Sequence, residues 1–231
     1  MKSNGIEKNI ARIFSQNYVR HFSGISLDEL PVKKEIGAIF GDVRSIYVFY
    51  LPHSNGLLDL KKRRAFTAKN SDNTMYLNSI FLRSLKIIYT EIERISLQVS
   101  NYLESMGNMS LPVPVRCIPG EEDILPFSLI RIAQYAGLGG EGENKCLLTP
   151  DYGPRIIMGA VVTTFTYEDD KPKQIDPCRH CFKCADICPT GALSMARDKI
   201  YFWERCNMCS LCEIVCPVGQ ANQDNGELNA S

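Results

Sequence analysis

The 231-residue sequence lacks three features that would assign it to a broad class at once. Basic and acidic residues number 26 each, so no net charge points to nucleic acid, and we do not expect tRNA among the partners. No apolar run approaches the roughly 18 residues of a membrane helix, so we expect no membrane association. The N-terminal residues contain neither the apolar core of a secretory signal nor a twin-arginine motif, which favours a cytoplasmic location.

What the sequence does contain is an unusual cysteine string that occurs twice. The runs are Cys178-x2-Cys181-x2-Cys184-x3-Cys188-Pro189 and Cys206-x2-Cys209-x2-Cys212-x3-Cys216-Pro217. Each run has the spacing of the bacterial ferredoxin motif, and a pair of runs predicts two cubane [4Fe–4S] clusters. An electron-transfer protein or a redox enzyme is therefore the first expectation.

The spacing suits a cubane, which needs four thiolates directed inward from different sides. Three cysteines spaced two residues apart wrap one face, and the fourth is carried away by the turn into proline. In two-cluster ferredoxins this fourth cysteine ligates the other cluster. The predicted ligands are Cys178, Cys181, Cys184 and Cys216 for cluster 1, and Cys206, Cys209, Cys212 and Cys188 for cluster 2.

Two other uses of cysteine fit the pattern less well. Zinc sites use paired CxxC knuckles rather than a three-cysteine run followed by Cys-Pro. A disulfide framework needs a secreted, oxidising context. The remaining cysteines, Cys117 and Cys146, stand alone in apolar surroundings, and we expect both to be small core residues.

Hydrophobic periodicity predicts a mixed α/β region before the cysteine runs. An amphipathic helix is expected to begin near Ile6, and a longer one covers residues 76–106 and ends at Gly107. Residues 45–51, and residues 156–162 within the segment 155–167, have the composition of buried strands. A short extended segment at 113–117 and a helix over 126–136 complete the prediction.

Residues 53–75 are expected to be polar and irregular. They include the basic run Lys61-Lys62-Arg63-Arg64, which could attract an anionic ligand. A solvated face is the preferred interpretation of such a run. Lys171-Pro172-Lys173 marks a linker, so we expect two domains, residues 1–170 and residues 171–231.

A glycine-rich stretch, Gly137 to Gly142, follows the predicted helix over 126–136. Glycine permits positive φ angles and a close approach of backbone to a ligand. The stretch matches neither a dinucleotide-binding G-x-G-x-x-G loop after a strand nor a P-loop. By itself it is equally typical of a helix end followed by tight turns.

The order of motifs resembles a known superfamily. AGLG at 136–139, LLTPDYGPR at 147–155, GAVVT at 159–163 and the Cys-Pro runs resemble the epoxyqueuosine reductases and corrinoid reductive dehalogenases. The resemblance covers residues 113–217 and extends more weakly to the first strand and the long helix. It implies an α+β fold, with a nitroreductase-like α/β N-terminal domain followed by a bacterial two-[4Fe–4S] ferredoxin-like module, and a cobalamin pocket between them.

The resemblance also implies roles for individual residues. Asp123 lies near the position of the catalytic acid in the epoxyqueuosine reductases, and Tyr152 is a second candidate proton donor. An exposed acidic turn and a structural tyrosine are the alternatives. The corrinoid-facing positions are Gly137, Gly139, Gly140, Gly142, Thr149, Pro150, Tyr152, Gly153 and Arg155.

The sequence also departs from the epoxyqueuosine reductase pattern AGLGWIGK. Gly140 replaces the tryptophan, Glu143 replaces the lysine, and the chain stops soon after the second run, which argues against queuosine synthesis. The absence of an export signal argues likewise against respiratory dehalogenation. A short relative with an unidentified substrate is what remains.

Two hypotheses about function follow. The first is an iron–sulfur oxidoreductase that passes electrons through two [4Fe–4S] clusters to a bound cobalamin. The second is an electron-transfer protein, such as a corrinoid-protein reductase or activator, that docks on a separate redox partner. A flavin in the nitroreductase-like pocket is a weaker possibility than a corrinoid. Expected partners are an electron donor such as ferredoxin or flavodoxin, and a corrinoid protein or a small-molecule substrate.

Overall fold

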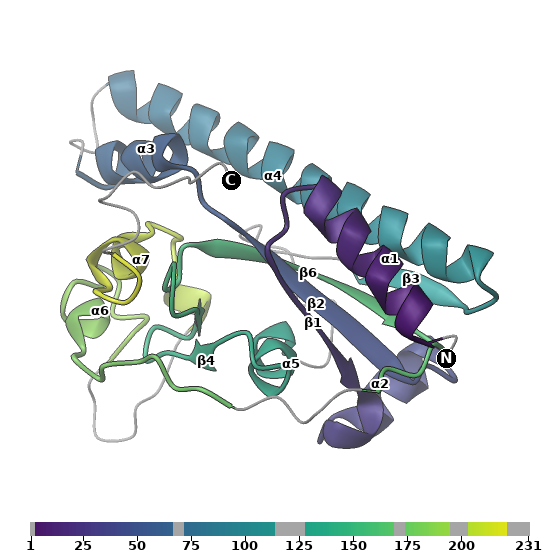
Figure 1. The fold of residues 1–231 in the computed structure, drawn as a ribbon. Coiled ribbons are helices and arrows are strands. Elements are labelled where there is room, and N and C mark those ends of the chain that lie inside the picture. The colour runs from purple at the N-terminus through teal and green to yellow at the C-terminus, as the bar shows by residue number, and fades with distance from the viewer. Residues whose placement is uncertain (1–2, 67–71, 114–127, 169–173, 195–202, 221–231) are drawn as a thin grey trace. The chain divides into compact units, whose positions relative to one another are not determined.

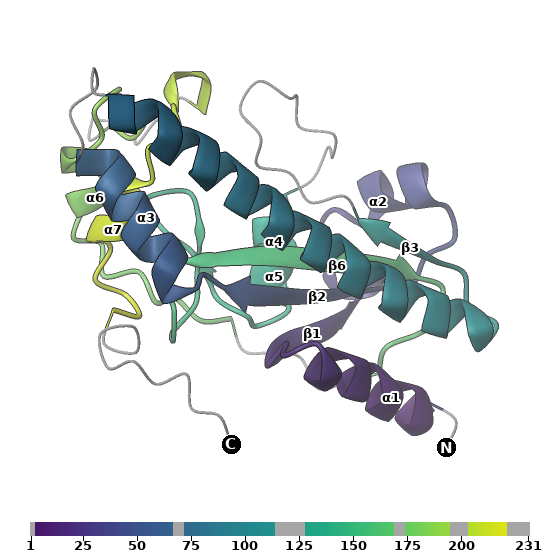
Figure 2. The same ribbon diagram turned by 90° about the horizontal axis from the view of Figure 1, so that it is seen from above.

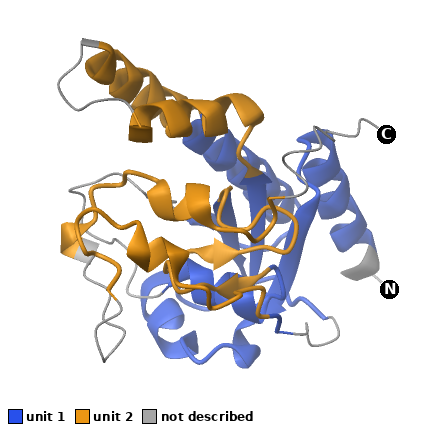
Figure 3. Cartoon of the chain, turned by 90° about the vertical axis from the view of Figure 1, so that its left-hand side faces the viewer, with its two compact units in different colours: residues 1–51, 88–138, 157–175 blue, residues 52–87, 139–156, 176–231 orange. Residues whose placement is uncertain are grey.

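The computed structural model describes residues 3–66, 72–113, 128–168, 174–194 and 203–220. The chain is mixed α/β and forms two compact units that alternate along the sequence (Figure 3). Unit 1 comprises residues 1–51, 88–138 and 157–175, and unit 2 comprises residues 52–87, 139–156 and 176–231. The predicted domain boundary at residue 170 remains a prediction. Asp123 and Cys117 lie outside the described residues.

Unit 1 is built on a four-stranded sheet with the strand order β1-β2-β6-β3. The strands are β1 His21–Ser26, β2 Ser45–Pro52, β6 Ile156–Thr163 and β3 Ser110–Val113. β1 pairs antiparallel with β2, and β3 pairs antiparallel with β6. The first six residues of β2 are buried, as its continuous apolar run predicted.

Helices cover both faces of this sheet. On one face lie α1 (Ser3–Gln16) and the C-terminal part of α4 (Asp72–Ser105), and on the other lies α5 (Leu129–Tyr135) (Figures 1 and 2). Phe14 of α1 packs on Phe22 and Phe49, with ring centroids 4.5 and 5.0 Å apart. A short 3-10 turn at Leu27–Glu29 and helix α2 at Lys33–Phe40 follow β1.

Helix α4 confirms the predicted long helix and extends it at the N-terminus. Ile92, Ile95 and Val99 from the predicted apolar stripe are fully buried. Gly107 has φ +83°, and the N–H of Asn108 donates to Leu103 O at 3.0 Å, so the helix ends as the sequence indicated. None of the helices in the described part of the chain is long and apolar enough to cross a bilayer.

Unit 2 contains α3 (Asn55–Phe66), the beginning of α4 and a small hairpin. The hairpin strands are β4 Gly140–Glu141 and β5 Leu147–Leu148. The cysteine runs add α6 (Lys183–Asp186), a 3-10 turn at Trp203–Arg205 and α7 (Leu211–Val215). The expectation of an irregular segment over 53–75 is wrong, because α3 occupies twelve of these residues. Its weakly amphipathic sequence, dense in charge, concealed the helix.

Candidate functional site

The two cysteine runs adopt the same backbone conformation in unit 2. The third residue of each run is left-handed, with φ 47° at His180 and 52° at Met208, and so is the fifth, with φ 57° at Phe182 and 64° at Ser210. Left-handed backbone costs roughly 1–2 kcal/mol per non-glycine residue. A costly conformation that appears twice at equivalent positions indicates a functional requirement rather than chance.

Each left-handed residue at position five begins a short helix. The N–H of Ala185 donates to Phe182 O at 2.8 Å, and the equivalent N–H of Glu213 donates to Ser210 O at 3.1 Å. These turns form α6 and α7, which carry Cys184 and Cys212 and lie side by side (Figures 1 and 2). The equivalence continues beyond Cys-Pro to Gly191 and Gly219, with φ +63° and +69°.

The fourth cysteine of the second run lies with the first run. Cys216 is 9% exposed and packs with Leu148 and Val218, and Cys178 packs against the same group. Burial raises the pKa of the Cys184 thiol, and repulsion from Cys216 and Cys181 adds to the shift. The structure therefore brings together the four cysteines predicted for cluster 1.

Three of the four cysteines predicted for cluster 2 also lie near one another. Burial raises the pKa of Cys212 to about 12, and the negative charges of Glu213, Cys209 and Cys206 contribute. Cys188 instead accepts from the N–H of Leu193 at 3.5 Å and contacts the Thr190 hydroxyl at 3.7 Å. Among the described residues, no hydrogen bond joins Cys188 to the second run.

The donor chemistry of the two runs is that of iron–sulfur clusters. Within the described ranges, no three His, Cys, Asp or Glu side chains converge as ligands of one metal ion. A cubane binds its thiolates at separate iron corners, so its ligands need not converge on one point. Two equivalent loops of cysteines suit two [4Fe–4S] clusters. The positive charge of the iron would favour the thiolate form of these cysteines, although burial alone favours the protonated thiol.

The segment predicted to face a corrinoid forms a tight turn within unit 2. Thr149 is fully buried and exchanges two backbone hydrogen bonds with Gly153, at 3.0 and 2.8 Å. The Thr149 hydroxyl also accepts from the N–H of Tyr152 at 3.2 Å, so it shapes the turn. Pro150 is exposed and Tyr152 is half-buried. The turn places Arg155 beside the second cysteine run.

Arg155 is 3% exposed and spans the end of that run. Its Nη1 donates to Glu213 O at 2.9 Å and to Cys216 O at 3.1 Å, and its Nη2 donates to Val218 O. The guanidinium therefore satisfies carbonyls at the end of α7 and places a positive charge beside Cys216. Sequence reasoning assigned Arg155 to a corrinoid and did not foresee these contacts.

The glycine-rich stretch is explained by packing within the chain. Gly137 has φ +76° and closes α5, while Gly140 lies buried in β4. A Cβ on Gly139 would lie 2.4 Å from Leu148 O, and one on Gly142 would lie 2.6 Å from Leu148 Cδ1. The space beside Gly139 and Gly142 is filled by Leu148 and its neighbours rather than left for a corrinoid.

One of the departures noted in the sequence, Glu143, and the lone Cys146 acquire a structural context. Glu143, which stands where a lysine is usual, contacts His180 Nδ1 at 2.9 Å. His180 lies inside the first cysteine run, so this contact ties the glycine-rich stretch to that run. Cys146, expected in the core, is only half-buried, and its thiol approaches Asn144 O at 3.6 Å.

The basic run on α3 is not a uniformly solvated face. Lys62 and Arg63 are exposed, whereas Lys61 is 2% exposed and forms an ion pair with Glu213. Lys61 Nζ also lies 3.2 Å from Nδ1 of His53, which is itself buried. A cavity of about 300 Å³ adjoins this group, between α3, α7 and Arg155.

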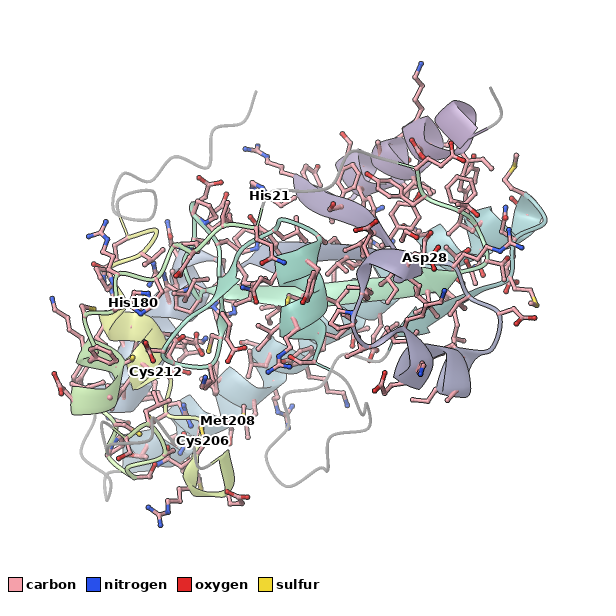
Figure 4. All side chains as sticks on the ribbon, turned by 90° about the horizontal axis from the view of Figure 1, so that it is seen from below. His21, Asp28, His180, Cys206, Met208 and Cys212 are labelled. Carbon is pink, nitrogen blue, oxygen red and sulfur yellow. The ribbon has the colours of Figure 1, made fainter. Side chains whose placement is uncertain are left out.

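Arg64 contacts the second cysteine run directly. Its Nη1 donates to Met208 O at 2.8 Å, and its Nε donates to Asn78 Oδ1 at 2.6 Å. Figure 4 labels Met208 with Cys206 and Cys212 of the same run. Lys61 and Arg64 are three residues apart, so both lie on one side of α3. This spacing predicts a shared side only when the segment is known to be a helix.

Sequence comparison finds relatives in two families. No family model matches the chain. The epoxyqueuosine reductase of Bacillus cereus is 42% identical over 62 residues, 27% of this chain and 16% of that protein. The tetrachloroethene reductive dehalogenase of Dehalobacter restrictus is 31% identical over 113 residues, 48% of this chain and 19% of that protein. The matched regions thus span less than a fifth of these relatives' lengths.

Fold comparison gives the same two families. An epoxyqueuosine reductase solved with an epoxyqueuosine-modified tRNA stem loop superposes with a TM-score of 0.66 and 16% identity, covering 95% of this chain and 67% of that one. A reductive dehalogenase whose structure suggested a mechanism for B12-dependent dehalogenation superposes with a TM-score of 0.52, covering 78% of this chain and 24% of that one.

These matches correct one expectation. The deduction that tRNA is not a partner is wrong, because the fold that matches most of this chain occurs in a protein solved with a tRNA stem loop. A net charge of zero sums over the whole chain and does not describe any local surface. In sequence over its matched segments and in fold over most of its length, the chain resembles the superfamily of epoxyqueuosine reductases and reductive dehalogenases.

Proposed function

We propose that the chain is an iron–sulfur oxidoreductase in which electrons pass through two [4Fe–4S] clusters. The observation that carries this proposal is the duplicated left-handed backbone at His180, Phe182, Met208 and Ser210. These residues give both runs the same loop conformation, which suits three cysteines two residues apart that bind one cubane. The sequence relatives support the redox class, since both are named as reductases.

The two clusters are proposed to exchange their fourth ligands. The packing of Cys216 and Cys178 against one apolar group supports this exchange for cluster 1. Cys188 would complete cluster 2 by the same rule. Exchanged ligands hold two clusters in one small module, which favours rapid electron transfer between them. The ferredoxin-like module over 171–231 and a nitroreductase-like domain over 1–170 are part of this proposal.

A bound corrinoid is the proposed electron acceptor, on the strength of the likeness to a dehalogenase described as B12-dependent. When bound, it would supply a redox-active cobalt, and the protein would control its surroundings. Asp123 and Tyr152 remain the proposed proton donors. Because an epoxyqueuosine reductase of this fold was solved with a modified tRNA stem loop, such a stem loop belongs among the ligands to be tested.

The decisive experiment is an anaerobic titration of cluster-reconstituted protein with cob(II)alamin, followed by visible absorption. A base-on to base-off spectral change at micromolar protein is expected if a corrinoid binds. An unchanged cobalamin spectrum beside two intact clusters would contradict the proposed acceptor. That outcome would favour the second hypothesis, an electron-transfer protein that delivers electrons to a separate redox partner.

A further inference from the structure

Two arginines that lie outside the second cysteine run donate hydrogen bonds to its backbone carbonyls. Arg155 donates to the carbonyls of Cys216 and Val218, at the end of the second run. Cys216 is the cysteine that packs with Cys178 of the first run. Arg64 of α3 donates to Met208 O, between Cys206 and Cys209. The two guanidinium groups therefore lie beside different predicted clusters, Arg155 beside cluster 1 and Arg64 beside cluster 2.

Arg64 is fixed in position by three separate contacts. Besides Met208 O, it donates to the Asn78 side chain at 2.6 Å, and its guanidinium carbon lies 4.5 Å from the ring centroid of Phe81. Phe81 is 2% exposed, so this aromatic platform belongs to the interior of unit 2. A half-buried arginine stacked on a buried ring cannot swing into solvent without losing all three contacts.

The other cations of α3 have less influence on the second run. Lys61 is neutralised by its ion pair with Glu213. Arg63 is exposed and pairs with Asp59 at 2.7 Å, and Lys62 is also exposed, so solvent and salt screen both. Arg64 is always protonated and lies in a less hydrated environment, where its charge acts more strongly.

A fixed positive charge favours the more negative state of a neighbouring redox centre. Reduction adds one electron to a cubane, and its potential depends on net charge, on hydrogen bonds and on exposure. We propose that Arg64 raises the reduction potential of cluster 2, so that α3 influences which of the two clusters holds the electron. This inference rests on the two clusters of the proposed function. Arg64 is a positioning residue and takes no part in bond making.

The test compares Arg64→Gln with Arg63→Gln, a neighbour that carries the same charge but is exposed. Each protein is reconstituted anaerobically and titrated potentiometrically, with both clusters followed by electron paramagnetic resonance. In Arg64→Gln one of the two midpoint potentials should fall. At a fixed potential the reduced-to-oxidised ratio of that cluster should drop at least threefold, where tenfold corresponds to about 59 mV for one electron. Arg63→Gln should leave both potentials unchanged.

Unchanged potentials in an Arg64→Gln protein with full iron content would overturn the inference, as would an equal shift of both clusters. If Arg64→Gln loses iron, Arg64→Lys decides, because lysine keeps the charge without the planar fork. A potential near that of the wild type in Arg64→Lys supports a charge effect, and a clear fall overturns it. Failure of the proposed function would look different, because the wild type would then lack two cubane signals.

Discussion

The two cysteine runs share a backbone but not an environment. Both contain the same pair of left-handed residues and the same one-turn helix. The third residue of the first run, His180, contacts the carboxylate of Glu143 at 2.9 Å, whereas the carbonyl of the equivalent Met208 in the second run accepts from the half-buried Arg64. The comparison teaches that local sequence specifies the conformation of the metal-binding loop, while charged residues far away in sequence determine the electrostatic environment around it.

The largest effect should come from removing a ligand from either run. Cys184→Ser and Cys212→Ser each take one thiolate from a different predicted cluster, at equivalent positions on α6 and α7. Iron content should fall from about eight to about four per chain in each variant, and unit 2 should lose stability because metal ligation contributes to folding. Iron and sulfide analysis checks this. A variant that keeps the full content would remove its cysteine from the ligand set.

The next effect concerns the two arginines. Arg155→Gln leaves three carbonyls near Cys216 without their charged donor, which should cost about 4 kcal/mol of unfolding free energy. Arg64→Gln loses the hydrogen bonds to Met208 O and Asn78 and the stacking on Phe81, and it should cost less, about 2 kcal/mol, because the site is partly open to water. Urea denaturation of the two reconstituted proteins measures both values. Equal losses would show that the buried Arg155 and the half-buried Arg64 do not differ in the way described.

A smaller contrast is expected at the glycines that follow the two runs. Gly191 and Gly219 have nearly the same positive φ, so alanine should cost about 1 kcal/mol at either position through backbone strain alone. A Cβ on Gly219 would also lie 2.4 Å from Gly153 N, whereas one on Gly191 meets no atom of the described residues within 4 Å. Gly219→Ala should therefore be less stable than Gly191→Ala by about 2 kcal/mol. Matching melting temperatures would disprove this contrast.

The smallest effect is a pH dependence of stability in the group around Lys61. Burial lowers the pKa of His53 well below its usual 6.5, and the charges of Lys61 and Arg155 lower it further, despite Glu213 at 3.8 Å. His53 therefore stays neutral in the folded protein, while the unfolded chain takes up a proton below pH 6.5. The stability is complete above that pH and is lost as the pH falls, by at most about 1.4 kcal/mol per pH unit.

Thermal unfolding measured from pH 7.5 to 5 tests this dependence. The wild type should lose stability over the lower half of the range, and His53→Gln should lose measurably less. An identical slope in the two proteins would remove His53 as the source of the pH dependence.

Sequence periodicity predicted the elements of the fold that bury a clear apolar stripe or run. The helices α1, α4 and α5 and the strands β2 and β6 were all expected, the two strands because each is a continuous apolar run. Strand β1 was missed, because HFSGIS mixes polar residues and a glycine in six positions. Its Gly24 is required by tertiary contact alone, since a Cβ would lie 2.5 Å from the Tyr167 ring.

The site shows the same division between local and distant information. Spacing alone indicated the cysteine ligands, because a cubane constrains residues that are close in sequence. The contact of Arg64 with Met208 joins residues 144 positions apart, and that of Arg155 with Cys216 joins residues 61 apart. Hydrophobic periodicity in a sequence cannot predict contacts between residues so far apart. The basic run on α3 was visible, but without a helix its buried and exposed halves could not be separated.

The central claim is that the two runs hold two cubane clusters. It is tested most directly by Mössbauer spectroscopy of anaerobically reconstituted wild-type protein, combined with iron and sulfide analysis. The account predicts about eight irons and eight sulfides per chain, all in [4Fe–4S] environments, with two distinguishable signals on reduction. About four irons, or bound zinc in place of iron, would contradict the claim and with it the electron path built on the two runs.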